Sequence, residues 1–168
     1  MPTRSNLIIF LLVAKYFTVV AVLVAGLFLA SCQPRPVLDE KREFAGQGWS
    51  HSDTLDFNVS IPDTTGHYDL FLNMEHSVEF PNQNFYIRIY TRFPDGKRLD
   101  KLVSLELADK SGAWFGRCNS NTCRLRIPIQ ENAYFNQAGD YLFTLEQYSR
   151  MDTLPGLSYM GMLIRPSK

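Results

Sequence analysis

The chain has 168 residues, of which 45% are hydrophobic and 13% aromatic, the composition of an ordinary globular protein of about one domain. Lysine and arginine together number 17, and so do aspartate and glutamate, which gives a formal net charge of zero. A generic nucleic-acid binder needs an excess of basic side chains to neutralise phosphates. The charge balance therefore argues against nucleic acid as a partner, and composition alone indicates no activity.

Residues 1–31 have the organisation of an export signal. A basic start leads into two apolar runs, 7–14 and 19–30, which are separated by Lys15. The runs end in Leu29-Ala30-Ser31-Cys32, which resembles the bacterial lipoprotein box in all four positions. We therefore expect a lipoprotein signal peptide over 1–31 and acylation of Cys32, which becomes the first residue of the mature chain.

A retained transmembrane helix and ordinary secretion are the alternatives, since 7–31 is long enough to cross a bilayer. Lys15 argues against the helix, because a charge at its centre costs about 2.5–3.5 kcal/mol on insertion scales. Gln33 follows the cysteine, and by analogy the absence of aspartate there favours the outer membrane in bacteria with two membranes. The leaflet stays open. Acyl chains worth about 0.8 kcal/mol per buried methylene would anchor the protein to that membrane.

Cleavage would leave a mature chain with 15 basic and 17 acidic side chains, since Arg4 and Lys15 are lost with the signal peptide. Residues 32–48 begin with the cysteine that we expect to be lipidated. The residues after it mix prolines and glycines with charged residues, which predicts a flexible tether up to residue 48. The folded domain is expected over 49–168, a length that suits a single hydrophobic core.

The folded part shows a hydrophobic period of two, which is typical of half-buried strands. In segment 99–108 a helix competes, but its apolar residues spread too widely around a helical wheel to form one face. We expect strands over 55–61, 68–74, 85–92, 99–108, a short piece at 113–116, 123–129, 141–147 and 157–164.

About eight short strands and no amphipathic helix after the signal predict an all-β domain. Each alternating strand must bury one face, so the fold expected is an antiparallel β-sandwich.

Cys118 and Cys123 enclose a polar four-residue turn, and an exported protein meets an oxidising compartment in which such a pair can form a disulfide. Two reduced cysteines are the alternative, because sequence does not give the separation of the two Cα atoms. The neighbouring residues offer no further zinc ligands.

The three histidines, His51, His67 and His76, are expected on the surface, with His67 and His76 on opposite faces if one strand carries both. No metal or cofactor is expected. Segments typical of hydrolases, phosphate-binding loops and zinc proteases are missing from the sequence, which gives no positive sign of an enzyme. A hydrolase would need three convergent polar side chains in a deep pocket.

Tyr86 and Tyr90 share a strand face with Arg88 and Arg92. Tyrosine and arginine are the side chains that interfaces favour, although the same face suits an ordinary solvated sheet. Aromatic residues are expected mostly in the core, with a sugar-stacking platform or a protein-binding patch as the functional alternatives; they include Trp49, Tyr86, Tyr90, Trp114, Phe115, Tyr134, Phe135 and Tyr148.

Two segments follow patterns that occur in this order in one family. The pattern Leu-Ala-Asp-x-x-Gly-x-Trp-x-Gly is kept at Leu107, Ala108, Asp109, Gly112, Trp114 and Gly116. The pattern Gln-x-Met-Arg-x-Asp-x-Leu is kept at Gln147, Arg150, Asp152 and Leu154, with Ser149 in place of the methionine. With the lipoprotein box, these segments resemble the gliding motility lipoprotein GldH family over most of 49–166.

The resemblance implies a non-catalytic component of the cell-envelope apparatus that moves surface adhesins during gliding, linked to a dedicated secretion system. Its partners would be the membrane, through the acyl chains, and unidentified proteins of that machinery. From the residues themselves, Trp114 is expected to pack into the core between Gly112 and Gly116, which favours a structural role for the first segment. A carbohydrate- or small-ligand-binding surface lipoprotein is the alternative function.

Overall fold

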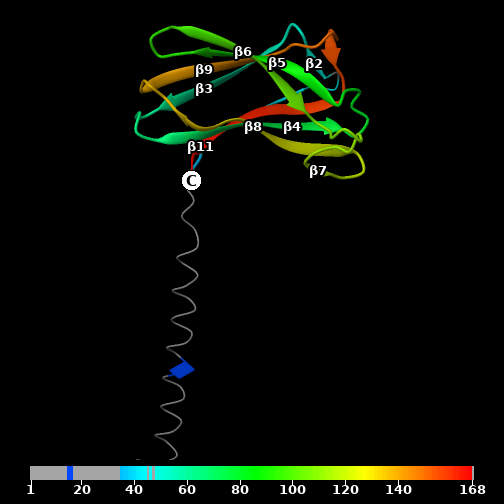
Figure 1. Ribbon diagram of the computed structural model, residues 1–168, viewed down its shortest axis with the longest axis horizontal. Coiled ribbons are helices and arrows are strands. Elements are labelled where there is room, and N and C mark those ends of the chain that lie inside the picture. The colour runs from blue at the N-terminus through cyan, green and yellow to red at the C-terminus, as the bar shows by residue number, and fades with distance from the viewer. Residues whose placement is uncertain (1–14, 17–34, 45, 47, 168) are drawn as a thin grey trace, which may run out of the picture. The chain divides into compact units, whose positions relative to one another are not determined.

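The computed structural model describes residues 15–16, 35–44, 46 and 48–167 (Figure 1). The chain divides into two compact units, Met1–Pro34 and Arg35–Lys168. The expected signal peptide lies outside the described residues except for Lys15 and Tyr16, and Cys32 lies outside them as well. Within the described part, no helix has the length and apolar character that crossing a membrane requires.

The second unit consists of antiparallel strands that form two main sheets. The strands in chain order are β1 Leu38–Glu43, β2 Trp49–Ser50, β3 Thr54–Ile61, β4 His67–Ser77, β5 Asn84–Arg92, β6 Arg98–Glu106, β7 Arg117–Cys118, β8 Thr122–Tyr134, β9 Gly139–Gln147, β10 Thr153–Leu154 and β11 Leu157–Pro166.

A five-stranded sheet in the order β1-β11-β4-β8-β7 faces a four-stranded sheet in the order β3-β9-β5-β6 (Figure 1). The short strands β10 and β2 form a separate two-stranded sheet. The core fills the space between the two layers, with Leu72 and Met74 from one sheet and Ile87 and Leu145 from the other fully buried. The predicted antiparallel β-sandwich is confirmed.

Period-two alternation explains the strands. In β3 the residues Leu55, Phe57, Val59 and Ile61 are buried and the intervening residues are exposed. The same pattern gives β9, which pairs with the whole length of β3. Segment 98–106 is the strand β6, so the helix considered for it does not form.

The tether predicted through residue 48 is wrong for residues 38–43. These residues form β1, which pairs with β11 from Leu38 opposite Ile164 to Glu43 opposite Tyr159. The segment lacks apolar alternation because β1 is an edge strand, in which only Leu38 is buried. Arg42 replaces an apolar side chain there: its guanidinium lies 4.9 Å from the Phe57 ring centroid and donates to the Asp56 carbonyl.

The short strand expected at 113–116 does not form either. Only an isolated bridge joins Ala108 and Trp114, because the segment between them is a tight turn.

Candidate protein-binding surface

The first family segment closes a turn between β6 and β7. The Asp109 carboxylate accepts hydrogen bonds from the backbone N–H groups of Ser111 and Ala113, at 2.8 and 3.0 Å, and from the Ser111 hydroxyl at 2.6 Å. These bonds favour the ionised form and lower the pKa of Asp109. The carboxylate thus organises the turn.

Trp114 holds that turn to the body of the domain. Its indole packs edge-on against the His76 ring, with centroids 4.7 Å apart, and its Nε1–H donates to the Val78 carbonyl at 3.1 Å. The side chain is half-buried and packs against the core. Gly116 follows with a φ of 87°, in the left-handed region that favours glycine. The geometry therefore supports a structural role for this segment.

The expectation that all three histidines lie on the surface is wrong for His76, which is fully buried, whereas His51 and His67 are exposed. Alternation does place His67 and His76 on opposite faces of β4. His76 is buried because the Trp114 and Phe80 rings cover it. Among the described residues, no group of histidine, cysteine and acidic side chains could hold a metal ion.

His76 should make stability depend on pH. Its Nδ1 lies 2.7 Å from the Ser77 carbonyl and its Nε2 has no partner, and burial lowers the pKa of the imidazole below its ordinary value of 6.5. As pH falls through 6.5, the unfolded chain therefore binds a proton that the folded domain does not. The free energy of unfolding should decrease by up to about 1.4 kcal/mol per pH unit in that window.

Urea unfolding between pH 7.5 and 5 measures this slope. The variant His76→Asn should lose it and the exposed control His67→Asn should keep it. An equal slope in both variants would contradict the assignment to His76. Lowered carboxylate pKa values, such as that of Asp69, act only near and below roughly pH 4.

Cys118 and Cys123 form a disulfide between β7 and the start of β8, where the two residues lie directly opposite each other. The Cys123 side chain is fully buried. The loop between them is held by Asn119, whose side-chain oxygen accepts from the N–H groups of Asn121 and Thr122, each at 2.8 Å. The bridge closes one short hairpin at the end of the five-stranded sheet.

The second family segment is organised by Gln147, a fully buried polar residue at the end of β9. Its Nε2 donates to the Met151 carbonyl at 2.9 Å, and its Oε1 accepts from the N–H and the hydroxyl of Ser149, at 3.0 and 2.6 Å. Both the donor and the acceptor of the amide are therefore used to fold the loop back on itself. This loop fixes the position of Tyr148, whose N–H donates to the Tyr86 carbonyl at 2.8 Å.

The outer face of the four-stranded sheet carries a group of exposed aromatic and apolar side chains. Tyr86, Leu102 and Tyr148 are 44%, 47% and 45% exposed. The register of β5 and β6 places Arg88 directly opposite Leu102. We call Tyr86, Arg88, Tyr90, Leu102 and Tyr148 the aromatic face.

Arg88 is held at the centre of the aromatic face. Its guanidinium carbon lies 4.6 Å from the centroid of the Tyr148 ring, and its Nε is 4.0 Å from an Asp100 carboxylate oxygen. Tyr90 beside it donates to Glu146 at 2.7 Å, and this bond raises the pKa of the Tyr90 phenol. Arg88 and Tyr90 are thus already oriented in the free protein, which lowers the entropy that binding a partner would lose.

The structure brings together three of the four residues in which the sequence suggested an interface, namely Tyr86, Arg88 and Tyr90. Arg92 lies further along the same face, beside Arg98 and Leu142. Tyr148 was among the aromatic residues singled out, but its stacking on Arg88 depends on the fold. Sequence analysis did not single out Leu102. Alternation in 98–106 nevertheless places Leu102 and the buried Leu105 on opposite faces of the strand, so that Leu102 lies outside the core.

Comparison with known proteins agrees with the two family segments. The model of the GldH lipoprotein family matches residues 36–164, which include the strands of both sheets except the last two residues of β11. The chain belongs to the GldH lipoprotein family. The match begins ahead of β1, consistent with β1 being part of the folded domain.

Two curated relatives support the assignment to the GldH lipoprotein family. The "Gliding motility lipoprotein GldH homolog" of Christiangramia forsetii is 23% identical over 158 residues, covering 90% of this chain and 96% of the relative. The "Gliding motility lipoprotein GldH" of Flavobacterium johnsoniae is 23% identical over 149 residues, covering 84% and 92%.

Solved structures with some likeness to this GldH-family chain include two carbohydrate-binding modules. A family 28 module specific for non-crystalline cellulose has a TM-score of 0.44 at 11% identity, covering 76% of this chain and 73% of the module. A family 35 module from Clostridium thermocellum has a TM-score of 0.33 at 12% identity, covering 74% and 87%.

Proposed function

We propose that this chain is a non-catalytic lipoprotein of a bacterial gliding-motility machinery and of the secretion system associated with it. It is anchored at the outer membrane through acyl chains on Cys32. It acts by binding other proteins of that machinery. Membership of the GldH lipoprotein family supports the first part of this proposal, because both curated relatives are named as motility lipoproteins or their homologues. The Leu29-Ala30-Ser31-Cys32 sequence supports the anchor.

The aromatic face is the surface that we assign to protein binding. Tyrosine and arginine dominate the energetics of protein interfaces. The single observation that carries this assignment is Arg88, which is stacked on the exposed Tyr148 and flanked by the exposed Tyr86 and Leu102. Confinement to a membrane raises the effective concentration of anchored partners, so that contacts of modest affinity suffice.

Carbohydrate binding is the alternative use of the same residues. A sugar ring would stack on an open tyrosine face. The Arg88 guanidinium already covers one face of Tyr148 at 4.6 Å, which favours a protein partner over a sugar.

The double variant Tyr86→Ala/Arg88→Ala tests the proposal. In cells that carry it in place of the wild-type gene, crosslinking should recover machinery proteins at least about 30-fold less efficiently, because interface hot spots are worth 2 kcal/mol or more. Colony spreading should be lost with them. Stability should fall by no more than about 1–2 kcal/mol, since Tyr86 is exposed and Arg88 is only half-buried, with a stack on Tyr148 and a long ion pair to Asp100.

Arg126→Ala is the matched control. Arg126 lies 5.9 Å from the centroid of the Phe71 ring, so it is also an arginine over an aromatic ring, but on the five-stranded sheet. The control should keep both partner recovery and spreading. Normal spreading of the double variant would reject the aromatic face, and glycan binding lost in the same variant would favour the carbohydrate alternative.

A further inference from the structure

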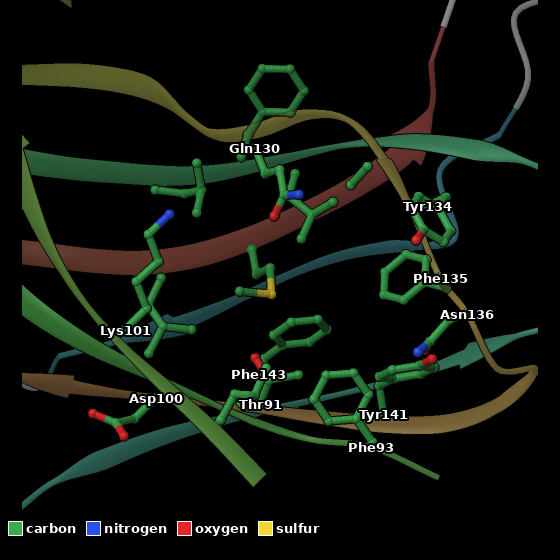
Figure 2. Close-up of a pocket in the computed structure, with 17 residues that line it drawn as sticks. Thr91, Phe93, Asp100, Lys101, Gln130, Tyr134, Phe135, Asn136, Tyr141 and Phe143 are labelled. Atoms are coloured by element: carbon green, nitrogen blue, oxygen red, sulfur yellow. The ribbon is translucent and has the colours of Figure 1, made fainter. Parts of the chain in front are cut away.

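The two sheets do not close along one edge of the sandwich. The cleft there has a volume of about 380 Å³ and opens between β6 and the part of β8 that extends beyond β7 (Figure 2). Volumes of this size, with mostly apolar walls and a few polar groups, are typical of small-ligand sites. At the β1 edge, by contrast, Arg42 lies over the core ring of Phe57.

The cleft is open because no strand of the five-stranded sheet covers the inward-facing residues at the start of β6. Alternation from the buried Leu105 places Val103, Lys101 and Leu99 on the inner face of the sheet. Leu99 is nevertheless 64% exposed, and across the gap Ile129 is only half-buried. Apolar surface therefore faces solvent at a position where a closed sandwich would bury it.

The inner end of the cleft is aromatic. The Tyr141 ring packs edge-on against Phe135 and Phe93, with centroids 4.8 and 5.5 Å apart. The Tyr141 hydroxyl donates to the Gln137 carbonyl at 2.9 Å, so its polar atom is already satisfied. Figure 2 shows Phe93, Phe135, Tyr141 and Phe143 gathered on one side of the cleft. This wall suits a hydrocarbon group better than a polar one.

Lys101 supplies the charge at the mouth. Figure 2 shows its side chain extending from β6 across the opening, toward the strand that carries Gln130. Within the described part of the chain, the ammonium group has no hydrogen bond or ion pair, whereas the neighbouring Asp100 lies near Arg88. An inward lysine can protect an edge strand from pairing with another chain. Here it also places a positive charge, without a salt bridge among the described residues, beside an apolar cleft whose lining includes Asp100 as its acidic residue.

The cleft lies at the end of the domain where the anchor segment joins it. β1 begins at Leu38, which pairs with Ile164, and Ile164 pairs with the cleft residue Leu70. Two strand spacings therefore separate Leu38 from that wall, about 10 Å. The chain from Cys32 to Leu38 can span at most about 20 Å.

We propose that this cleft binds the acyl chain of an anionic membrane lipid, with the chain against the aromatic wall and the anionic head group paired with Lys101. The proposal rests on the membrane anchoring that is part of the proposed function. An acyl chain linked to Cys32 itself is neutral at its point of attachment and would leave Lys101 unpaired, which is why a separate anionic lipid is the occupant.

Photolabelling with palmitic acid that carries a diazirine in its chain tests the proposal. The full chain is reconstituted in phosphatidylcholine vesicles, irradiated, digested and mapped by mass spectrometry. Label should concentrate in peptides that cover 91–101 and 129–136. Unlabelled palmitate should compete, and in Lys101→Gln at least about tenfold more should be needed, because a charged hydrogen bond contributes about 1.5–3 kcal/mol.

Arg98→Gln is the matched control, since it removes the same charge from the same strand but on the outer face, beside Tyr90. It should compete like the wild type, whereas Leu99→Glu, at an already exposed position, should also weaken labelling. Label spread evenly over the domain, or competition unchanged in Lys101→Gln, would overturn the proposal. Vesicle flotation in the same samples reports the anchor separately, so a failure of the cleft and a failure of the proposed anchoring are distinguishable.

Discussion

Replacement of Gly116 by alanine should lower the free energy of unfolding by at least about 3 kcal/mol. Gly116 has a φ of 87°, where any other residue is strained by about 1–2 kcal/mol. A Cβ atom there would also overlap the carbonyl oxygen of Arg124 and lie 3.1 Å from Leu125 Cγ. Because the overlap is with backbone of β8, relief requires the strand to move, which adds to the strain. Chemical unfolding of the two proteins measures the difference.

Gly96→Ala is the matched control for the strain alone. Gly96 has a φ of 83°, but a Cβ atom at that position would meet nothing within 4 Å. We expect it to destabilise the domain by about 1 kcal/mol. Equal effects of the two substitutions would show that the contact with Arg124 has no consequence, and that Gly116 is required only for its backbone conformation.

The strands that alternate between apolar and polar residues could be predicted from sequence because each buries one face in the same core. β3 and β9 are examples, with buried residues at every second position. β1 could not be predicted this way. Its inward residues after Leu38 are Glu40 and Arg42, which lie at the rim of the sandwich where a charged side chain reaches water.

The burial of His76 could not be predicted from the sequence either. Alternation gives the face on which a residue lies, but a loop from elsewhere in the chain decides whether that end of the strand is covered. Here the Trp114 ring covers the His76 ring, and only folding brings these two residues, which are far apart in sequence, into contact. The cleft beside Lys101 has the same origin, since inward positions of β6 look alike in sequence whether or not a partner strand covers them.

The candidate surface was partly predictable for related reasons. Tyr86, Arg88 and Tyr90 follow from alternation within one strand. The stack of Arg88 on Tyr148 does not, because it joins β5 to the residue after β9 and depends on the loop that Gln147 organises. The second family segment thus combines a structural role with the placement of one residue of the aromatic face.

Replacement of Gln147 by leucine should therefore affect both stability and the aromatic face. Leucine fills much of the same space but removes the bonds of the amide to the Met151 carbonyl and the Ser149 N–H. The Met151 carbonyl keeps the bond from the Ser149 hydroxyl, at 3.2 Å, whereas the Ser149 N–H loses its acceptor. A buried polar group left unpaired costs about 1–3 kcal/mol and a lost hydrogen bond about 0.5–1.5 kcal/mol, so we expect a loss of about 2–4 kcal/mol in the free energy of unfolding. Release of the loop should also displace Tyr148 from Arg88, and partner recovery by crosslinking should fall even at temperatures where the variant stays folded.

Gln137→Leu is the matched control, since among the described residues the Gln137 side chain donates only to the exposed Asp95 carboxylate, at 3.2 Å. It should change stability by less than about 0.5 kcal/mol, because surface substitutions away from buried networks have small effects.

The variant Gln147→Glu tests the donor of the amide separately from its acceptor. Glutamate keeps an oxygen that can accept from Ser149, but it loses the N–H that is donated to Met151 and it buries a charge. It should be at least as destabilising as the leucine variant, because the buried charge has no cationic partner among the groups that Gln147 contacts. If Gln147→Glu were as stable as the wild type, the loop would be held by contacts other than this amide, and the link between the second family segment and Tyr148 would fail.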